Sequence, residues 1–214
     1  MINFYDLPSK AAYAPGTMMT WRARYAINLK NLPYQTVYVE LPDIEALAKR
    51  IGTAPASTKS DGVSPFYTIP IIQDNSTGAV LTFADAVSDA FDHLRLPLFY
   101  SDLVVKTNAR TAIYMREKFS SVSSLEAPED KERKRLWAIT KEKLAKMNKC
   151  FEESEGDFVM GSEPCFADTV LCGFLWFMRR MVGEESEEWE TFISWNEGRW
   201  AKHLENFRPY EKIV

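Results

Sequence analysis

The spacing of hydrophobic positions changes along the first 94 residues between a strand period and a helix period. Alternation at every second residue predicts a strand, and recurrence every three to four residues predicts a helix. In chain order these patterns predict a strand at 2–5, a helix at 18–32, a strand at 34–41, a helix at 42–52, strands at 69–73 and 79–82, and a helix at 83–94. A loop rich in Thr, Pro, Ser and Gly occupies residues 53–65. One right-handed βαβ unit followed by a hairpin gives a small mixed sheet with helices on its faces.

The rest of the chain shows helical spacing only. After a short linker at 95–99, the pattern predicts helices at 106–119, 128–153 and 164–180 and one or two helices at 184–207, with no internal repeat. The expected fold is therefore a small α/β domain at residues 1–94, followed by an all-helical domain at residues 100–214.

Composition narrows the class of protein. The formal net charge of −4 over 214 residues gives no electrostatic case for nucleic-acid binding. The longest apolar stretch, at 170–178, is too short to span a bilayer, and the N-terminus lacks a basic region followed by an apolar run. We therefore expect a cytoplasmic protein without a membrane partner. The three cysteines lack metal-ligand spacing and the chain has two histidines, so no metal site is expected and the thiols are expected to be buried or capping.

The pair Ile69-Pro70 opens the third predicted strand. Proline has no N–H to donate to a strand ladder, so Pro70 is expected at a strand start or an edge. The simplest interpretation is an ordinary trans proline. If the bond is cis, the N–H and carbonyl of Ile69 turn away from the sheet and are free to pair with a peptide-like ligand lying alongside.

Two longer stretches carry a resemblance to a known family. They are residues 20–34, TWRARYAINLKNLPY, and residues 194–204, SWNEGRWAKHL. Together with the predicted order of elements and the Ile69-Pro70 pair, they resemble the glutathione transferases, in particular the fungus-specific class A enzymes, which are relatives of the etherases. The resemblance covers essentially the whole chain. It implies a thioredoxin-like N-terminal domain that binds glutathione, an all-helical C-terminal domain, and a cis bond at Ile69-Pro70.

The family's chemistry requires a group that holds the glutathione thiol as thiolate, because a free cysteine thiol has a pKa of about 8.5. A hydroxyl donor at a helix N-terminus meets this requirement. The family's serine matches Thr17, within the run from Gly16 to Thr20. The resemblance thus makes Thr17 and Thr20 the candidate catalytic residues. The alternative is that these threonines only cap the helix.

The resemblance also implies an acidic residue followed by serine at the start of the third helix, where the family holds the γ-glutamyl end of glutathione. Here Phe83 and Ala84 occupy those positions, and Asp85, one position further on, replaces the acid only if the start of the helix shifts. Two polar contacts to a charged ligand would be missing, each worth about 1.5–3 kcal/mol. Ile69, Pro70, Phe83, Ala84 and Asp85 are the candidate glutathione-binding positions, with glutathione as the co-substrate.

The helical domain is expected to shape the acceptor pocket. The candidates are aromatic and methionine side chains from both domains: Met18, Met19, Tyr114, Met115, Phe119, Phe166, Phe174, Phe177 and Met178. The alternative is that these side chains form ordinary core. Asp168 is expected to cap a helix together with Cys165, and His93 and His203 are expected to face solvent.

Two functions from different classes follow. The first is a glutathione transferase, used in detoxification and assembled as a homodimer as the family implies, whose thiolate attacks a small hydrophobic or aromatic electrophile or cleaves an ether. The second is a transferase-fold protein with a degraded glutathione site, which binds or rearranges a small hydrophobic molecule without glutathione. Phe83 and Ala84 favour the second, whereas Ile69-Pro70 and Thr17 favour the first. We adopt the first interpretation.

Overall fold

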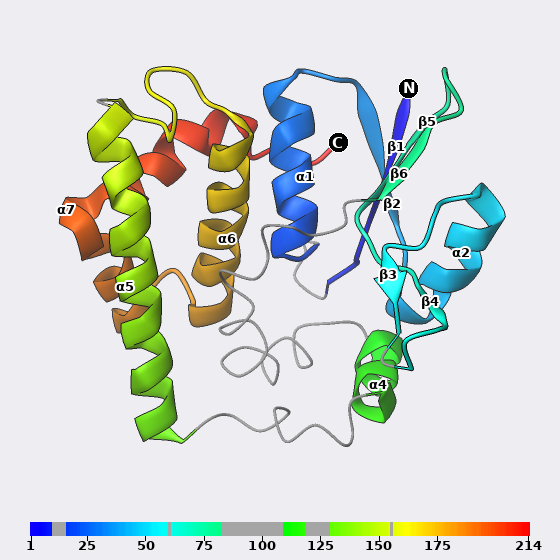
Figure 1. Cartoon of the computed structure of the whole chain (residues 1–214), viewed down its shortest axis with the longest axis horizontal. Coiled ribbons are helices and arrows are strands. Elements are labelled where there is room, and N and C mark those ends of the chain that lie inside the picture. Colours follow the sequence, from blue (N-terminus) through cyan, green and yellow to red (C-terminus); the bar gives the residue numbers. More distant parts are fainter. Residues whose placement is uncertain (10–15, 60, 83–108, 119–128, 155) are drawn as a thin grey trace.

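The computed structural model describes residues 1–9, 16–59, 61–82, 109–118, 129–154 and 156–214. Figure 1 shows a small sheet on one side and a group of helices on the other. Helix α1 (Met18–Leu29) lies between the sheet and helix α6 (Phe166–Val182). An α/β region followed by a helical region is therefore confirmed.

The sheet has four strands in the order β2-β1-β5-β6. Strands β1 (Ile2–Asp6) and β2 (Tyr34–Tyr38) are parallel and are joined through α1, which is the predicted βαβ unit. Strand β5 (Ile71–Asp74) runs antiparallel to β1, with Tyr5 opposite Ile71. Strand β6 (Val80–Thr82) completes the predicted hairpin with β5.

Several boundaries in this region differ from the prediction. Strand β2 ends at Tyr38 rather than at residue 41, and β5 begins at Ile71 rather than at residue 69. Helix α1 ends at Leu29 rather than at residue 32, because Lys30 caps it and Asn31 adopts a φ of 50°. The helix expected at 42–52 is a 3-10 turn, η1 (Leu41–Asp43), followed by α2 (Ile44–Ile51). The loop expected at 53–65 contains a small hairpin of β3 (Ser57–Thr58) and β4 (Pro65–Phe66). Strands of two residues are too short to produce a recognisable period.

The helical region contains α4 (Ala109–Lys118), α5 (Asp130–Ser154), α6, α7 (Glu187–Phe207) and the 3-10 turn η3 (Arg208–Tyr210). Non-helical backbone at Trp195–Gly198 divides α7 into two helical segments, where Asn196, Glu197 and Gly198 all have positive φ. None of the described helices is long and apolar enough to cross a membrane. The helix expected at 83–94 lies outside the described residues.

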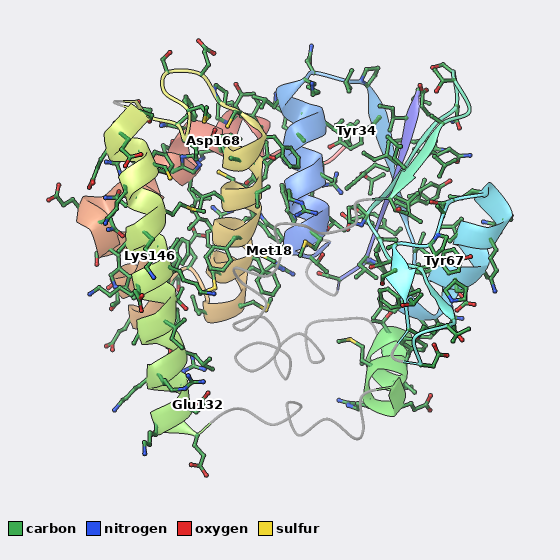
Figure 2. The ribbon with its side chains drawn as sticks, viewed as in Figure 1. Met18, Tyr34, Tyr67, Glu132, Lys146 and Asp168 are labelled. Carbon is green, nitrogen blue, oxygen red and sulfur yellow. The ribbon has the colours of Figure 1, made fainter. Side chains whose placement is uncertain are left out.

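The largest hydrophobic cluster joins the two regions. Trp21 of α1 stacks on Trp176 of α6, with ring centroids 4.3 Å apart. Figure 2 shows Met18 between the two helices, and Met18 belongs to the same buried cluster. On the other side of α1, Tyr34 lies between the helix and the sheet (Figure 2). Both faces of α1 are thus buried, so the start of this helix is held between the sheet and the helical region.

Candidate functional site

Thr17 is the N-cap of α1. Its side-chain oxygen accepts a hydrogen bond from the backbone N–H of Thr20 at 3.4 Å, and its own N–H donates to the hydroxyl of Thr20 at 2.7 Å. Capping uses a lone pair of the Thr17 hydroxyl and leaves its proton unused. Among the described residues, no acceptor takes that proton. Thr17 is half-buried, so capping the helix and donating to a ligand are compatible roles.

Thr20 is placed differently. Its side chain is fully buried, and its hydroxyl donates to the backbone carbonyl of Thr17 at 3.0 Å. The structure therefore places Thr20 inside the capping turn, behind Thr17. Of the two candidate threonines, Thr17 is the one with a hydroxyl proton to offer a ligand.

A buried ion pair lies directly behind this turn. Arg24 donates to the carboxylate of Asp6 at 2.7 Å, and both side chains are fully buried. The second guanidinium nitrogen of Arg24 donates to the hydroxyls of Tyr34, at 3.2 Å, and Thr36, at 3.0 Å. The hydrophobic pattern of the sequence does not predict this pair. The available signal was the position of Arg24, three residues after Trp21 on the apolar face of α1.

Asp6 also contacts the turn itself. Its carboxylate accepts from the N–H of Leu7 at 2.7 Å and lies beside the hydroxyl of Thr20. Burial raises the pKa of Asp6, while the charge of Arg24 and these hydrogen bonds act in the opposite direction. Gly16 has a φ of 102°, and a β-carbon there would lie 2.3 Å from the Thr20 hydroxyl oxygen and 2.9 Å from an oxygen of Asp6. Only glycine fits this position.

The Ile69-Pro70 bond is cis, as the family resemblance implied. Ile69 is buried, and among the described residues its N–H and carbonyl have no backbone partner. Its carbonyl accepts only a long hydrogen bond, of 3.4 Å, from the hydroxyl of Thr68. Because Tyr5 lies opposite Ile71 in the antiparallel ladder, Ile69 lies near Leu7, at the end of β1 that leads toward Thr17. The free amide of Ile69 and the start of α1 therefore share one end of the sheet.

Several predicted site residues lie outside the described residues: Phe83, Ala84, Asp85 and Phe119. Strand β6 ends immediately before Phe83, with Thr82 paired to Ile71. The predicted γ-glutamyl contacts would begin at this point of the chain, and the assignment of Phe83, Ala84 and Asp85 stays a prediction.

The predicted acceptor residues fall into two groups. The first is buried in the cluster that joins α1 to α6: Met18, Met19, Phe174, Phe177 and Met178. Outside this cluster, Met115 is buried and Tyr114 half-buried on α4, and Phe166 is exposed at the first residue of α6. The structure thus brings the first group together as packed core, and a role for any of these residues in an acceptor pocket stays a prediction.

The start of α6 confirms the structural role expected for Asp168. Its carboxylate accepts from the N–H of Cys165, the N-cap residue, and from the N–H of Val159, each at 2.8 Å. The expectation for the cysteines holds in part. Cys165 caps and Cys172 is buried, but Cys150 is exposed on α5.

The expectation that His203 faces solvent is wrong. Its side chain is 1% exposed and packs in α7 against the rings of Phe151, Phe158 and Phe207. Its Nε2 lies 3.6 Å from a carboxylate oxygen of Asp168. Burial lowers the pKa of His203, and the charge of Asp168 opposes this effect. His93 lies outside the described residues.

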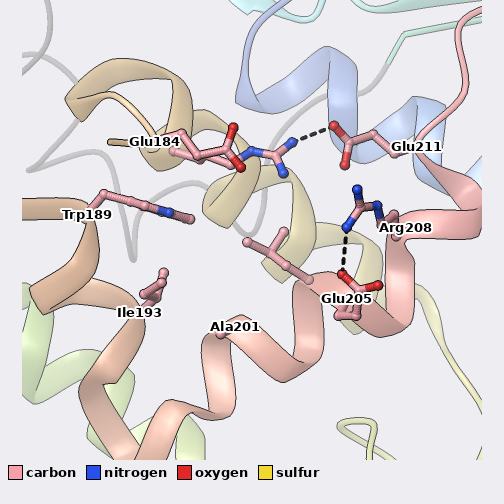
Figure 3. Close-up of a pocket in the computed structure, with 9 residues that line it drawn as sticks. Glu184, Trp189, Ile193, Ala201, Glu205, Arg208 and Glu211 are labelled. Atoms are coloured by element: carbon pink, nitrogen blue, oxygen red, sulfur yellow. Dashed lines mark hydrogen bonds and ion pairs between the residues drawn. The ribbon is translucent and has the colours of Figure 1, made fainter. Parts of the chain in front are cut away.

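A separate hollow of about 150 Å³ lies between the end of α6, α7 and the C-terminal segment (Figure 3). Trp189 lines its apolar side, and Arg179 is paired with Glu211, which also accepts from the indole N–H of Trp176 at 3.2 Å. Arg208 donates to Glu205 at 3.1 Å. Both guanidinium groups of the hollow are thus already paired, and the Arg179 pair ties the C-terminal segment to α6.

Comparisons with known proteins bear on this site. The model of the glutathione S-transferase C-terminal domain matches residues 80–210. The chain is similar to a glutathione S-transferase of Ceriporiopsis subvermispora solved with glutathione, with 26% identity, a TM-score of 0.86, and coverage of 100% of this chain and 98% of the other. It is also similar to the glutathione transferase GSTFuA3 of Phanerochaete chrysosporium, with 29% identity, a TM-score of 0.85 and the same coverage. No curated protein matches the chain. Since the domain model matches more than half of its length, the chain belongs to the glutathione S-transferase family.

Proposed function

We propose that this protein is a glutathione transferase that binds glutathione beside Ile69 and uses its thiolate as the nucleophile. The observation that carries the proposal is the backbone of Ile69, which has no backbone partner in the part of the chain that the structure describes and lies at the end of the sheet from which the chain leads to Thr17. A thiol-containing peptide can pair with the backbone of Ile69 and place its thiol at the N-terminus of α1, so such a ligand suits both features. Two similar fungal transferases were solved in complex with glutathione, which supports this choice of co-substrate.

The role of Thr17 follows from its hydrogen bonds. Its hydroxyl caps α1 through a lone pair and donates its proton to the sulfur of glutathione, which favours the thiolate over the thiol. The partial positive charge at the start of α1 acts in the same direction. Both effects lower the thiol pKa below the free value of about 8.5, so more nucleophile is present at neutral pH.

The reaction balances without a further reagent. The thiol loses its proton to solvent, the sulfur attacks an electrophilic carbon of the acceptor, a C–S bond forms, and the leaving group departs with the bonding electrons. With an ether as acceptor, the broken bond is C–O and the leaving alkoxide takes up a proton. We propose a small hydrophobic or aromatic acceptor and a homodimeric enzyme.

A second candidate function rests on the sequence at Phe83 and Ala84. These residues replace the acid and the serine expected for the γ-glutamyl end of glutathione. A protein that lacks both contacts binds glutathione more weakly, by about tenfold or more per contact. The same fold would then bind or rearrange a small hydrophobic molecule without glutathione.

Calorimetric titration with glutathione, followed by a conjugation assay with an activated aryl halide, separates the two functions. For a transferase we expect both heat of binding and turnover. The turnover should disappear when S-methylglutathione replaces glutathione in the assay, and the heat of glutathione binding should disappear when S-methylglutathione competes in the titration. Absence of both heat and turnover at millimolar glutathione would replace the first function by the second.

A further inference from the structure

We propose that the buried Asp6–Arg24 pair is a positioning element for the thiolate site: Asp6 holds the Gly16–Thr17 turn in place, and Arg24 cancels the charge of Asp6 so that a thiolate can form beside it. This inference rests on the proposed function. It assigns a role to two residues that do not themselves touch glutathione.

The positioning part follows from the contacts of Asp6. The carboxylate of Asp6 accepts hydrogen bonds from the N–H of Leu7 and the guanidinium of Arg24, and it lies beside the hydroxyl of Thr20. Thr20 in turn holds both the N–H and the carbonyl of Thr17. The position of the Thr17 hydroxyl is therefore set through Thr20 by a carboxylate that is itself fixed at the end of β1.

The same carboxylate reaches the other half of the site. Leu7, whose N–H it accepts, packs in the cluster that contains Ile69. Gly16 lies next to the same carboxylate, with no room for a β-carbon. Asp6 thus contacts both the turn that carries the candidate thiol donor and Leu7, which packs in the cluster of Ile69.

The charge part follows from burial. A lone carboxylate behind Thr17 would repel a thiolate. Because Asp6 is buried, the low local dielectric would make that repulsion strong. Arg24 is at 2.7 Å, fully buried, and held by Tyr34 and Thr36 on its far side. A buried ion pair is often no more stabilising than apolar residues of the same size, so stability alone does not explain the presence of both charges.

The test is the pH titration of the bound thiol, followed by the ultraviolet absorbance of the thiolate in the full-length protein saturated with glutathione. Asp6→Asn removes a negative charge and should lower the thiol pKa, whereas Arg24→Gln removes a positive charge and should raise it. For charges roughly 10 Å apart at an effective dielectric of about 20, each change is about one pH unit. A purely structural role predicts no such opposite pair of shifts.

The double variant Asp6→Asn with Arg24→Gln is the matched control. It leaves the net charge as it is in the natural protein, so the thiol pKa should return to within about half a pH unit of the original value. Its kcat should still fall by about tenfold or more, because an amide pair holds the turn less firmly than a charged pair. Arg24→Lys, which keeps the charge, should leave the thiol pKa in place.

The outcomes separate this inference from the proposed function. Shifts of opposite sign in the single variants support it, and shifts of the same sign, or none, overturn it. If the single variants do not fold, the double variant decides: a kcat equal to that of the unmodified protein overturns the inference. If the unmodified protein gives no thiolate band with glutathione, the proposed function fails and the inference fails with it.

Discussion

Gly173 of α6 lies directly against the first turn of α1, next to Met18. A β-carbon on Gly173 would lie 2.8 Å from the carbonyl oxygen of Met18 and 2.9 Å from the backbone nitrogen of Arg22. Both neighbours are backbone atoms, which cannot move aside as a flexible side chain can. Because Thr17 caps this same turn, the position of the candidate thiol donor depends on how closely α6 approaches α1.

The substitution Gly173→Ala therefore tests the contact between α1 and α6. Helix propensity alone predicts a gain of about 1 kcal/mol in the free energy of unfolding. We expect instead a loss of about 1–3 kcal/mol, because the added methyl group forces α1 and α6 apart. Urea unfolding measures the sign. Ala145→Gly, on the exposed face of α5, is the control for propensity, and a stabilised Gly173→Ala protein would contradict the close contact.

A second prediction concerns the C-terminal segment, which is held against α1 and β2. The side-chain amide of Asn28 donates to the carbonyls of Tyr210, at 2.6 Å, and Lys212, at 3.0 Å. The N–H of Thr36 in turn donates to the carbonyl of Val214 at 2.8 Å.

Asn28→Ala removes two of these hydrogen bonds and should lower the free energy of unfolding by about 1–2 kcal/mol. It should also speed proteolysis of the segment after Phe207. Lys30→Ala, at an exposed position two residues further on, is the control and should change neither quantity. Equal proteolysis rates in both variants would show that Asn28 does not hold the segment.

Local patterns in the sequence predict most of the fold. Strand β1, helix α1 and the helices after residue 128 each repeat hydrophobic residues long enough for a period to show. The β3–β4 hairpin has strands of two residues and shows no period. The turn at Asn196 depends on three successive residues with positive φ, and the middle one, Glu197, gives no signal of that conformation in the sequence.

The site was less predictable, for a physical reason. Thr17 was found through the family resemblance, and its capping role through the ordinary preference of helix starts for threonine. Asp6 and Arg24 are 18 residues apart and meet only when β1 and α1 pack together. The prediction that His203 faces solvent was wrong for the same reason. Its burial depends on three aromatic rings that α5, α7 and the loop before α6 bring around it.

The buried histidine predicts a pH dependence of stability. Burial lowers the pKa of His203 below its ordinary value of 6.5, so the unfolded chain takes up a proton more readily than the folded one. The stability that His203 contributes is thus present above pH 6.5 and is lost as the pH falls below that value. Urea midpoints measured from pH 8 to pH 5 should fall less steeply for His203→Gln than for the unmodified protein. Parallel curves would show that His203 takes up its proton equally in both states.

Thr17→Val tests the thiol donor directly. Loss of one hydroxyl donor to a developing anion should lower kcat by about a hundredfold and move the pKa of the bound thiol toward the free value. Removing the cap should also lower the free energy of unfolding by about 1 kcal/mol. Thr17→Ser keeps the hydroxyl and should keep kcat within a few-fold. If Thr17→Val destabilises the protein but leaves kcat unchanged, Thr17 only caps α1.

The departure at Phe83 and Ala84 leads to the last prediction. If these residues occupy the positions of the family's acid and serine, then Phe83→Glu combined with Ala84→Ser should restore two contacts to the γ-glutamyl end. Binding of glutathione should then tighten by about a hundredfold or more, since each restored hydrogen bond to a charged group is worth about 1.5–3 kcal/mol. Calorimetry measures the change, and each single variant should give part of it.

Asp85→Asn is the matched control for this alignment. In the unmodified protein it should leave the affinity for glutathione unchanged, because Asp85 lies one position beyond the expected acid. A loss of affinity in Asp85→Asn, together with no gain from the double variant, would place the acid at Asp85 and shift the start of the third helix by one residue. The two sets of variants therefore decide which residue meets the charged end of glutathione, independently of whether Thr17 activates its thiol.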